Sequence, residues 1–330
     1  MVSAPVEAAL RMEVALGQTY ELLDTQLPWL NPDKGQYVTK IQETSDAFTY
    51  LKDQFNKMND PQRRLPVEHL TGTKFPEIDR SRKAIVPGVL KEKGFSLRIN
   101  KEVLKSVPKA DAEIRENYTT AAYWLGVLVN YDMITQSIAG ANQTTAAFSP
   151  SESWANTNGT ADPVGDLMGL YQDMDNDGFE GELTDAWIYK SNWYQLQKYL
   201  KDVHISNAKI ENIYGEPEIH TDVINIPIVG DIHKIKSSNV GLSAGSVLGM
   251  DRNHPGLEYH YRIDPEYSTF KIQYYTRGPN GGAVLQETDN FGLHYRWYEE
   301  QASRDIIQEF WVEGQTVVKK PYNLIYATGI

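Results

Sequence analysis

Apolar residues recur at helical spacing between residues 108 and 140, and this is the clearest pattern in the chain. Pro108 suits a first helical turn, and Gly140 would end the helix. At 1.5 Å per residue such a helix would be roughly 45–50 Å long, well beyond the usual three turns. We therefore expect it to be the backbone of a domain. The residues that would form its buried face are Ile114, Tyr118, Ala121, Leu125 and Leu128.

Two shorter helices and a strand are expected next. Asp162 and Pro163 predict the N-cap and first-turn proline of one helix, which Gly178 would end. The run LTDAWIY (183–189) is typical of a strand. Ser191 would then cap a second short helix.

After residue 205 the pattern changes to short runs rich in β-branched and aromatic residues. The turn GPNGGA (278–283) is a strong hairpin signal, and Glu313–Gly314 would separate the last two strands. We therefore expect largely antiparallel sheet here, and an α+β fold for the whole chain. The expected strands are VINIPIV (223–229), LEYHYRI (257–263), TFKIQYY (269–275), FGLHYRWY (291–298), IIQEFWV (306–312) and TVVKKP (316–321).

The first hundred residues are less regular. Residues 5–27 predict a helix, and KGFSLRIN (93–100) alternates like a strand. The rest of 36–100 is punctuated by Pro and Gly and rich in both charges, so it is not expected to form a core alone. We expect an extended arm and a long excursion, such as a hairpin, that packs against a neighbouring molecule. Its basic islands, PQRRLP and IDRSRK, would be solvated or would meet acidic patches on another copy.

Composition narrows the function classes. The 330 residues are 41% hydrophobic and 23% charged, which is an ordinary globular balance. A net charge of -12 argues against general nucleic-acid binding, because phosphate neutralisation needs clustered Lys and Arg. With 0 cysteines there are no disulfides or thiolate sites. Neither a signal peptide nor a membrane span is expected, since Glu7 and Glu13 interrupt the start and the uncharged run 117–131 is too short.

The stretch DMDNDGFEGELT (173–184) resembles a calcium loop in its first half. An EF-hand loop places oxygen ligands at positions 1, 3 and 5 and a bidentate Glu at position 12. Asp173, Asp175 and Asp177 occupy the first three of these positions, but position 12 is Thr184, which lacks a carboxylate. We therefore favour the acidic last turn of a helix, and these three aspartates stay as the alternative calcium ligands.

No catalytic set is expected from the remaining motifs. There is no P-loop and no G-x-G-x-x-G after a strand, and GLSAG (241–245), with the letters of a nucleophile elbow, is set aside. The aromatic strands could stack bases or sugars, but without a basic stripe a packed or subunit-facing sheet is favoured. No zinc or general-base role is favoured for the histidines, which are His69, His204, His220, His233, His254, His260 and His294.

The order of the expected elements resembles the major capsid proteins of tailed viruses, which have the Hong Kong 97-type fold. The similarity covers most of the chain and is one of pattern. The segments that carry it are KGFSLRINKEVLKSVPKAD (93–111), SESWANTNGTADPVGDLMGLYQDM (151–174), LTDAWIYKSNWYQLQKYL (183–200) and DIIQEFWVEGQTVVKKPYNLIYATG (305–329).

The resemblance implies a division of the chain along its length. Residues 1–60 would be an N-terminal arm and 61–100 an extended loop. Residues 101–141 would be a peripheral domain with a long spine helix, and 142–256 an axial domain. Residues 257–330 would return as β-rich peripheral and axial strands.

The resemblance also implies a structural protein without catalytic residues or cofactors. Identical subunits would assemble as hexamers and pentamers into an icosahedral shell in the host cytoplasm and remain in the virion. The shell would enclose double-stranded DNA without sequence-specific contact and have no membrane partner. Scaffold, portal and decoration proteins would be separate chains. The acidic composition suits this, because a wall that bound DNA strongly would hinder packing.

Two other functions stay open. An encapsulin-type nanocompartment would use the same fold around enzyme cargo. A calcium-dependent β-rich binding module or hydrolase belongs to a different class. Either shell predicts large particles from the purified chain, whereas the hydrolase or binding module predicts a small oligomer that responds to metal through Asp173, Asp175 and Asp177.

Overall fold

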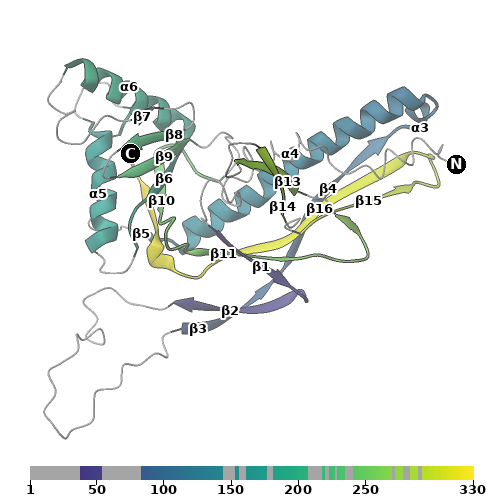
Figure 1. The fold of residues 1–330 in the computed structure, drawn as a ribbon, viewed down its shortest axis with the longest axis horizontal. Coiled ribbons are helices and arrows are strands. Elements are labelled where there is room, and N and C mark those ends of the chain that lie inside the picture. The colour runs from purple at the N-terminus through teal and green to yellow at the C-terminus, as the bar shows by residue number, and fades with distance from the viewer. Residues whose placement is uncertain are drawn as a thin grey trace, which may run out of the picture. The chain divides into compact units, whose positions relative to one another are not determined.

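The computed structural model shows an α+β chain divided into two compact units, each assembled from segments far apart in sequence (Figure 1). The first unit combines Met1–Phe48, Gly88–Met133 and Glu258–Val317, and the second combines Thr49–Pro87, Ile134–Leu257 and Val318–Ile330. The structure describes residues 38–53, 83–143, 153–155, 161–176, 181–206, 218–219, 223–226, 229–234, 241–269, 272–277, 283–288 and 292–330.

The first unit is built on a six-stranded sheet in which the 13-residue strand β16 is central. Strand β4 pairs antiparallel with β16 over nine residues, from Ile99 opposite Ile306 to Lys91 opposite Gly314. Strand β15 also pairs antiparallel with β16. The strands are β1 (Val38–Glu43), β4 (Lys91–Ile99), β11 (Leu257–Arg262), β12 (Ser268–Thr269), β15 (Leu293–Glu299) and β16 (Ile306–Val318).

The long helix α4 (Val107–Gly140) confirms the strongest periodicity in the sequence. It follows the short helix α3 (Lys101–Leu104), and in Figure 1 it runs alongside β16. The ring of Tyr118 makes edge-on contacts with Tyr295 and Phe310 of the sheet. Of the face expected to be buried, Ile114, Tyr118, Ala121 and Leu125 are buried, and Leu128 is half-buried.

The second unit has a seven-stranded sheet in the order β5-β17-β10-β6-β9-β8-β7. Pairs β6–β9 and β5–β17 are parallel, and the others are antiparallel. Its strands are β5 (Asn142–Gln143), β6 (Asp185–Ile188), β7 (Glu218–Ile219), β8 (Val223–Ile226), β9 (Gly230–Lys234), β10 (Ser246–Met250) and β17 (Leu324–Thr328), with a 3-10 turn, η4 (Pro321–Asn323), before the last.

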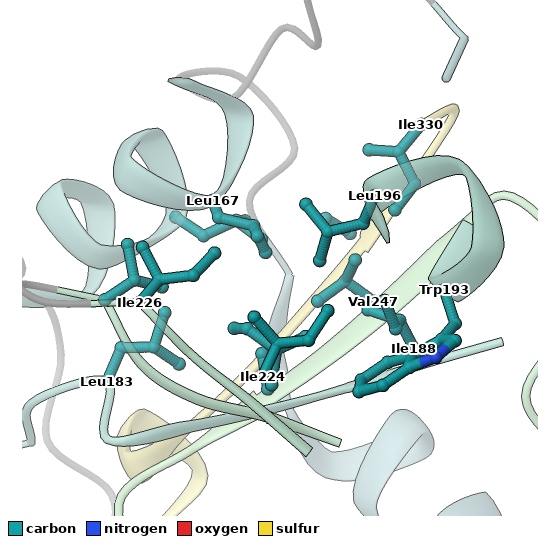
Figure 2. Packing of buried hydrophobic residues seen from close by; sticks show 14 of the residues in the cluster. Leu167, Leu183, Ile188, Trp193, Leu196, Ile224, Ile226, Val247 and Ile330 are labelled. Carbon is teal, nitrogen blue, oxygen red and sulfur yellow. The ribbon is translucent and has the colours of Figure 1, made fainter. Parts of the chain in front are cut away.

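Helices α5 (Pro163–Asn176) and α6 (Lys190–Ser206) pack on this sheet. Figure 2 shows side chains of both helices and of β6, β8 and β10 pointing toward one another in one apolar cluster. Asp162 caps α5 as expected, since its Oδ1 accepts the Gly165 N–H at 3.0 Å. The same carboxylate accepts the Tyr199 hydroxyl of α6 at 2.9 Å. Burial, followed by this bond, raises the pKa of Tyr199 to about 12.

Two pairs of strands form separate ribbons. Strands β13 (Ile272–Arg277) and β14 (Ala283–Thr288) pair antiparallel and confirm the hairpin expected at GPNGGA. Strands β2 (Ala47–Asp53) and β3 (Lys83–Val89) form the second pair, which we call the β2–β3 ribbon. The predicted helix at 5–27 and most of the predicted extended loop lie outside the described residues.

Three local expectations are wrong. Helix α6 begins at Lys190, so Ser191 lies inside its first turn, and the first helical bond runs from the Trp193 N–H to the Tyr189 carbonyl. Strand β16 passes through Glu313 and Gly314 without a break. Gly314 is needed because the Tyr259 ring lies where a Cβ would project, not because the chain turns.

The third correction concerns the first hundred residues, whose described part does find burial within its own chain. Val38, Phe48, Leu90 and Ile99 are all buried. Both β1 and β4 belong to the sheet of the first unit. Their partners are more than 200 residues away along the chain, so no local pattern could reveal that burial.

Candidate functional site

A cluster of ionisable side chains lies where β6 and β9 pair in parallel. Asp185 is opposite Asp231 in this register, and Trp187 is opposite His233. The Nε2 atom of His233 is 2.6 Å from Asp185 Oδ1. Among the described residues, Asp185, Asp231 and His233 offer ligand atoms that all lie within 4.8 Å of one another. The pairing thus creates a candidate metal centre from residues that are distant in sequence.

The guanidinium of Arg252 already occupies this cluster. Its Nη2 is 2.5 Å from Asp185 Oδ1 and 2.6 Å from Asp231 Oδ2, and its Nε donates to Asp185 Oδ2 at 2.9 Å. Thr184 Oγ1 donates to Asp185 Oδ2 at 2.8 Å, and Asn225 Nδ2 donates to Asp231 Oδ1 at 2.7 Å. Every carboxylate oxygen therefore has a donor, and a divalent cation would have to displace Arg252.

This charged network joins segments of the second unit through hydrogen bonds. The Arg252 N–H donates to Thr184 Oγ1 at 2.7 Å, so the segment after β10 is tied to the start of β6 through backbone as well as side chain. The neighbouring Asp251 is buried and accepts the N–H groups of Asn253 at 2.7 Å and Glu182 at 3.1 Å. We therefore interpret the cluster as structural: it holds three segments of the second unit together.

The structure places the calcium candidates differently from a metal loop. Helix α5 continues through Asn176, so Asp173 and Asp175 lie in its last turns, as the favoured interpretation expects. Asp177 lies outside the described residues. Calcium binding by these aspartates stays untested.

GLSAG (241–245) has the G-x-S-x-G spacing of a nucleophile elbow, so setting the motif aside on sequence grounds was wrong. A nucleophile elbow requires a sharp turn from a strand into a helix. Here the motif leads directly into strand β10, and Ser243 Oγ lies 3.4 Å from Ser246 Oγ. The structural context of a nucleophile elbow is thus missing on the C-terminal side of Ser243.

His233 and His260 stack on aromatic rings, and a third histidine, His254, lies 3.0 Å from Asp251. His233 stacks on Trp187 with ring centroids 4.5 Å apart, and His260 stacks on Phe48 at 4.1 Å. Tyr259 and Tyr261 are buried, which supports a packed sheet over a stacking platform. His69 and His220 lie outside the described residues.

His294 is a buried histidine held in its neutral form. Its Nε2 accepts the Asp264 N–H at 2.9 Å, and its ring stacks on Trp311. Burial lowers the pKa of His294, against smaller opposing effects of Gly292 and Asp264. An imidazolium at this position would lose the accepted hydrogen bond.

We predict that His294 makes the chain less stable as the pH falls. A base with a depressed native pKa takes up its proton in the unfolded state first, so stability is present above about pH 6.5 and is lost below it. The variant His294→Gln lacks this titration. The unfolding free energies of the wild type and the variant are measured in urea at pH 8 and pH 5.5. Between these two pH values the wild type should lose more stability than the variant. An unchanged difference would contradict the prediction.

The β2–β3 ribbon exposes an apolar face. Along β3 the exposed positions Ile85, Pro87 and Val89 alternate with half-buried ones. Ile85 is 72% exposed, Val89 60% and Leu51 of β2 46%. β-Branched side chains usually gain free energy from burial, and a two-stranded ribbon is at best marginally stable alone. This face is therefore the strongest candidate for a contact surface among the described residues.

A second exposed group lies on α4. Tyr123, Trp124 and Tyr131 are each about half exposed, and the rings of Tyr123 and Trp124 meet edge-on at 5.4 Å. The helix exposes no charge between Asn117 and Tyr131. Within the described part of the chain, no helix, α4 included, has the length and apolar character needed to cross a membrane.

Comparisons with known proteins find similarity in structure only. No family model and no curated protein matches the chain. Solved structures that resemble it include the virus-like particle from Pyrococcus furiosus, with 11% identity and a TM-score of 0.48 over 94% of this chain and 98% of the other. The capsid of the cyanophage P-SCSP1u matches with 11% identity and a TM-score of 0.46 over 88% and 86%.

An encapsulin is also among the similar structures. The holo-SrpI encapsulin complex from Synechococcus elongatus matches with 9% identity and a TM-score of 0.47, over 89% of this chain and 85% of the other. The predicted resemblance to capsid proteins thus has structural counterparts.

Proposed function

We propose that the chain is the structural subunit of a closed protein shell with the Hong Kong 97-type fold. The observation that carries the proposal is the apolar face of the β2–β3 ribbon, which is exposed in the single chain. Identical copies would cover this face, since repeated self-complementary contacts are how closed assemblies form.

The proposed division follows the resemblance in sequence. Residues 1–60 would be the arm, 61–100 the extended loop and 101–141 the peripheral domain with α4 as the spine helix. Residues 142–256 would be the axial domain, and 257–330 the returning strands. We propose no catalytic role, in keeping with an ionisable cluster whose carboxylates are taken by Arg252.

The proposed cargo is double-stranded DNA, and the alternative is protein, as in an encapsulin-type compartment. A net charge of -12 supports a wall that does not grip phosphates. The nucleic-acid and protein content of particles isolated from the native source separates the two. Particles filled with protein and free of DNA would overturn the DNA assignment and leave the shell itself standing.

We predict that Ile85→Asp abolishes assembly and leaves the chain folded. Ile85 is exposed, so a polar substitution should change the stability of the single chain by no more than about 0.5 kcal/mol. A carboxylate buried between copies would instead lose most of its hydration. Sedimentation velocity should show large particles for the wild type and small species for Ile85→Asp. The control Ile85→Val keeps an apolar side chain and should assemble, whereas particles formed equally well by Ile85→Asp would refute this contact.

A further inference from the structure

Strand β11 presents two chemically different faces. Tyr259 and Tyr261 are buried on one side of the strand. Glu258, His260 and Arg262 alternate with them and share the opposite side, because successive side chains of a strand point to opposite faces. Glu258 and His260 are nevertheless almost completely buried. Three ionisable side chains on the same face of one strand need polar or charged partners, because unpaired buried charges are costly.

The partners come from the end of β1 and the turn into β2. Glu43 Oε1 lies 2.7 Å from His260 Nδ1, and Asp46 forms an ion pair with Arg262. The ring of Phe48 stacks on His260 with centroids 4.1 Å apart and planes 15° apart. Residues 43–48 therefore cover the charged face of β11, and their side chains reach it at two successive positions.

Further carboxylates surround the side chains of His260 and Arg262. Glu258 Oε2 is 3.4 Å from His260 Nε2, so both ring nitrogens face a carboxylate. Glu313 Oε1 is 2.7 Å from Arg262 Nε, and Asp264 Oδ2 is 3.7 Å from its Nη2. Glu92 stands opposite Glu313 in the β4–β16 register. Burial raises the pKa of Glu313, Arg262 opposes this, and Asp46 and Glu92 reinforce it.

The return strand of the ribbon meets the same turn. The Leu90 N–H donates to the Asp46 carbonyl at 2.8 Å. The Phe48 ring lies where a Cβ of Gly88 would project, so only glycine lets the ring pack there. Residues 43–48 thus contact β11 on one side and the segment that leaves β3 on the other.

We propose that Glu43, Asp46 and Phe48, held by His260 and Arg262 of β11, form a charge-dependent latch that fixes the turn from which the β2–β3 ribbon starts. His260 Nδ1 lies within hydrogen-bond distance of Glu43, so this side chain holds the end of β1. Arg262 supplies the only fork of several N–H donors in the described part of this contact. Loss of Arg262 would leave the buried Glu313 without this cation and would remove the ion pair that holds Asp46, which would release the turn.

The latch is a property of the single chain. Its consequence for assembly rests on the proposed function, because only a shell subunit would use the ribbon between copies. Amide hydrogen exchange of the full, unassembled chain therefore tests the latch, and the particle assay tests the function. The hydrogen-exchange result can therefore confirm or refute the latch even if the chain forms no particles.

Arg262→Met should increase amide exchange in residues 43–53 and at Leu90 by about 10- to 100-fold, as expected when hydrogen bonds to a charged group are lost. The matched control is Arg296→Met, which removes another Arg–carboxylate pair of the same sheet, with Glu309, without touching the turn. It should leave exchange in 43–53 unchanged. Exchange in β10 and β17 of the second unit should not change in either variant.

Asp46→Asn provides a second test, in which the substituted residue lies in an exposed turn and not on a strand of the sheet. Asp46 is exposed, so the variant should fold normally, yet it removes the negative partner of Arg262 in the turn. We expect faster exchange confined to the same residues, by a smaller factor than for Arg262→Met. Unchanged exchange in both variants, or an equal increase throughout the sheet, would overturn the latch.

Discussion

Replacing Arg252 with methionine should destabilise the second unit by about 3 kcal/mol, the lower end of the cost of removing one partner from a buried ion pair. Asp185 is fully buried and would lose two of its donors, and Asp231 would lose its cation. The loss should not exceed this value because His233 and Thr184 still contact Asp185. Urea denaturation of the unassembled chain, followed by tryptophan fluorescence, measures the change.

Two further variants separate the lost charge pair from lost packing. Arg115→Met removes an exposed helical pair with Asp111 and should cost no more than about 0.5 kcal/mol. Asp185→Asn, added to Arg252→Met, should restore part of the stability, because the amide no longer brings an uncompensated charge. Additive losses in the double variant would show that the two side chains do not act as a pair.

Trp193→Ala should cost about 3–5 kcal/mol, the usual range for removing a large aromatic side chain from a core. Trp193 is 0% exposed and lies in the apolar cluster between α6 and the seven-stranded sheet (Figure 2). The cavity would be lined by rigid sheet residues such as Ile188 and Val247, which leaves little room for collapse.

The neighbouring tyrosine gives a matched control for this variant. Tyr194 lies on the same helix turn but is 52% exposed, so Tyr194→Ala should change the unfolding free energy by less than about 1 kcal/mol. Far-UV circular dichroism during urea denaturation follows both variants. Equal costs at the two positions would mean that α6 is not anchored through Trp193.

Helices were predictable because their signals are local. The spacing of Ile114, Tyr118, Ala121 and Leu125 is enough to define the buried face of α4, and Asp162 acts as the expected cap of α5. Most strands were also located, since their alternating or β-branched runs are short-range features. The predicted start of α6 was two residues late, because Tyr189 and not Ser191 precedes the helix, and Tyr is not among the residues that usually cap one.

The charged cluster could not be found in this way. Asp185 and Asp231 become neighbours only when β6 and β9 pair in parallel, and Arg252 reaches them from a third segment. An aspartate at the start of each strand, in LTDAWIY and VGDIHK, is the single hint in the sequence. The β4–β16 pairing could not be predicted either, because the periodicity of each strand does not say which distant strand it pairs with.

Negative-stain electron microscopy of the purified, unmodified chain tests the shell assignment most directly. Copies whose ribbon faces cover one another should appear as closed particles of uniform diameter, either spontaneously or once a scaffold chain is co-expressed. A population that stays monomeric or in small oligomers under both conditions, with Ile85 still accessible to solvent, would contradict the account.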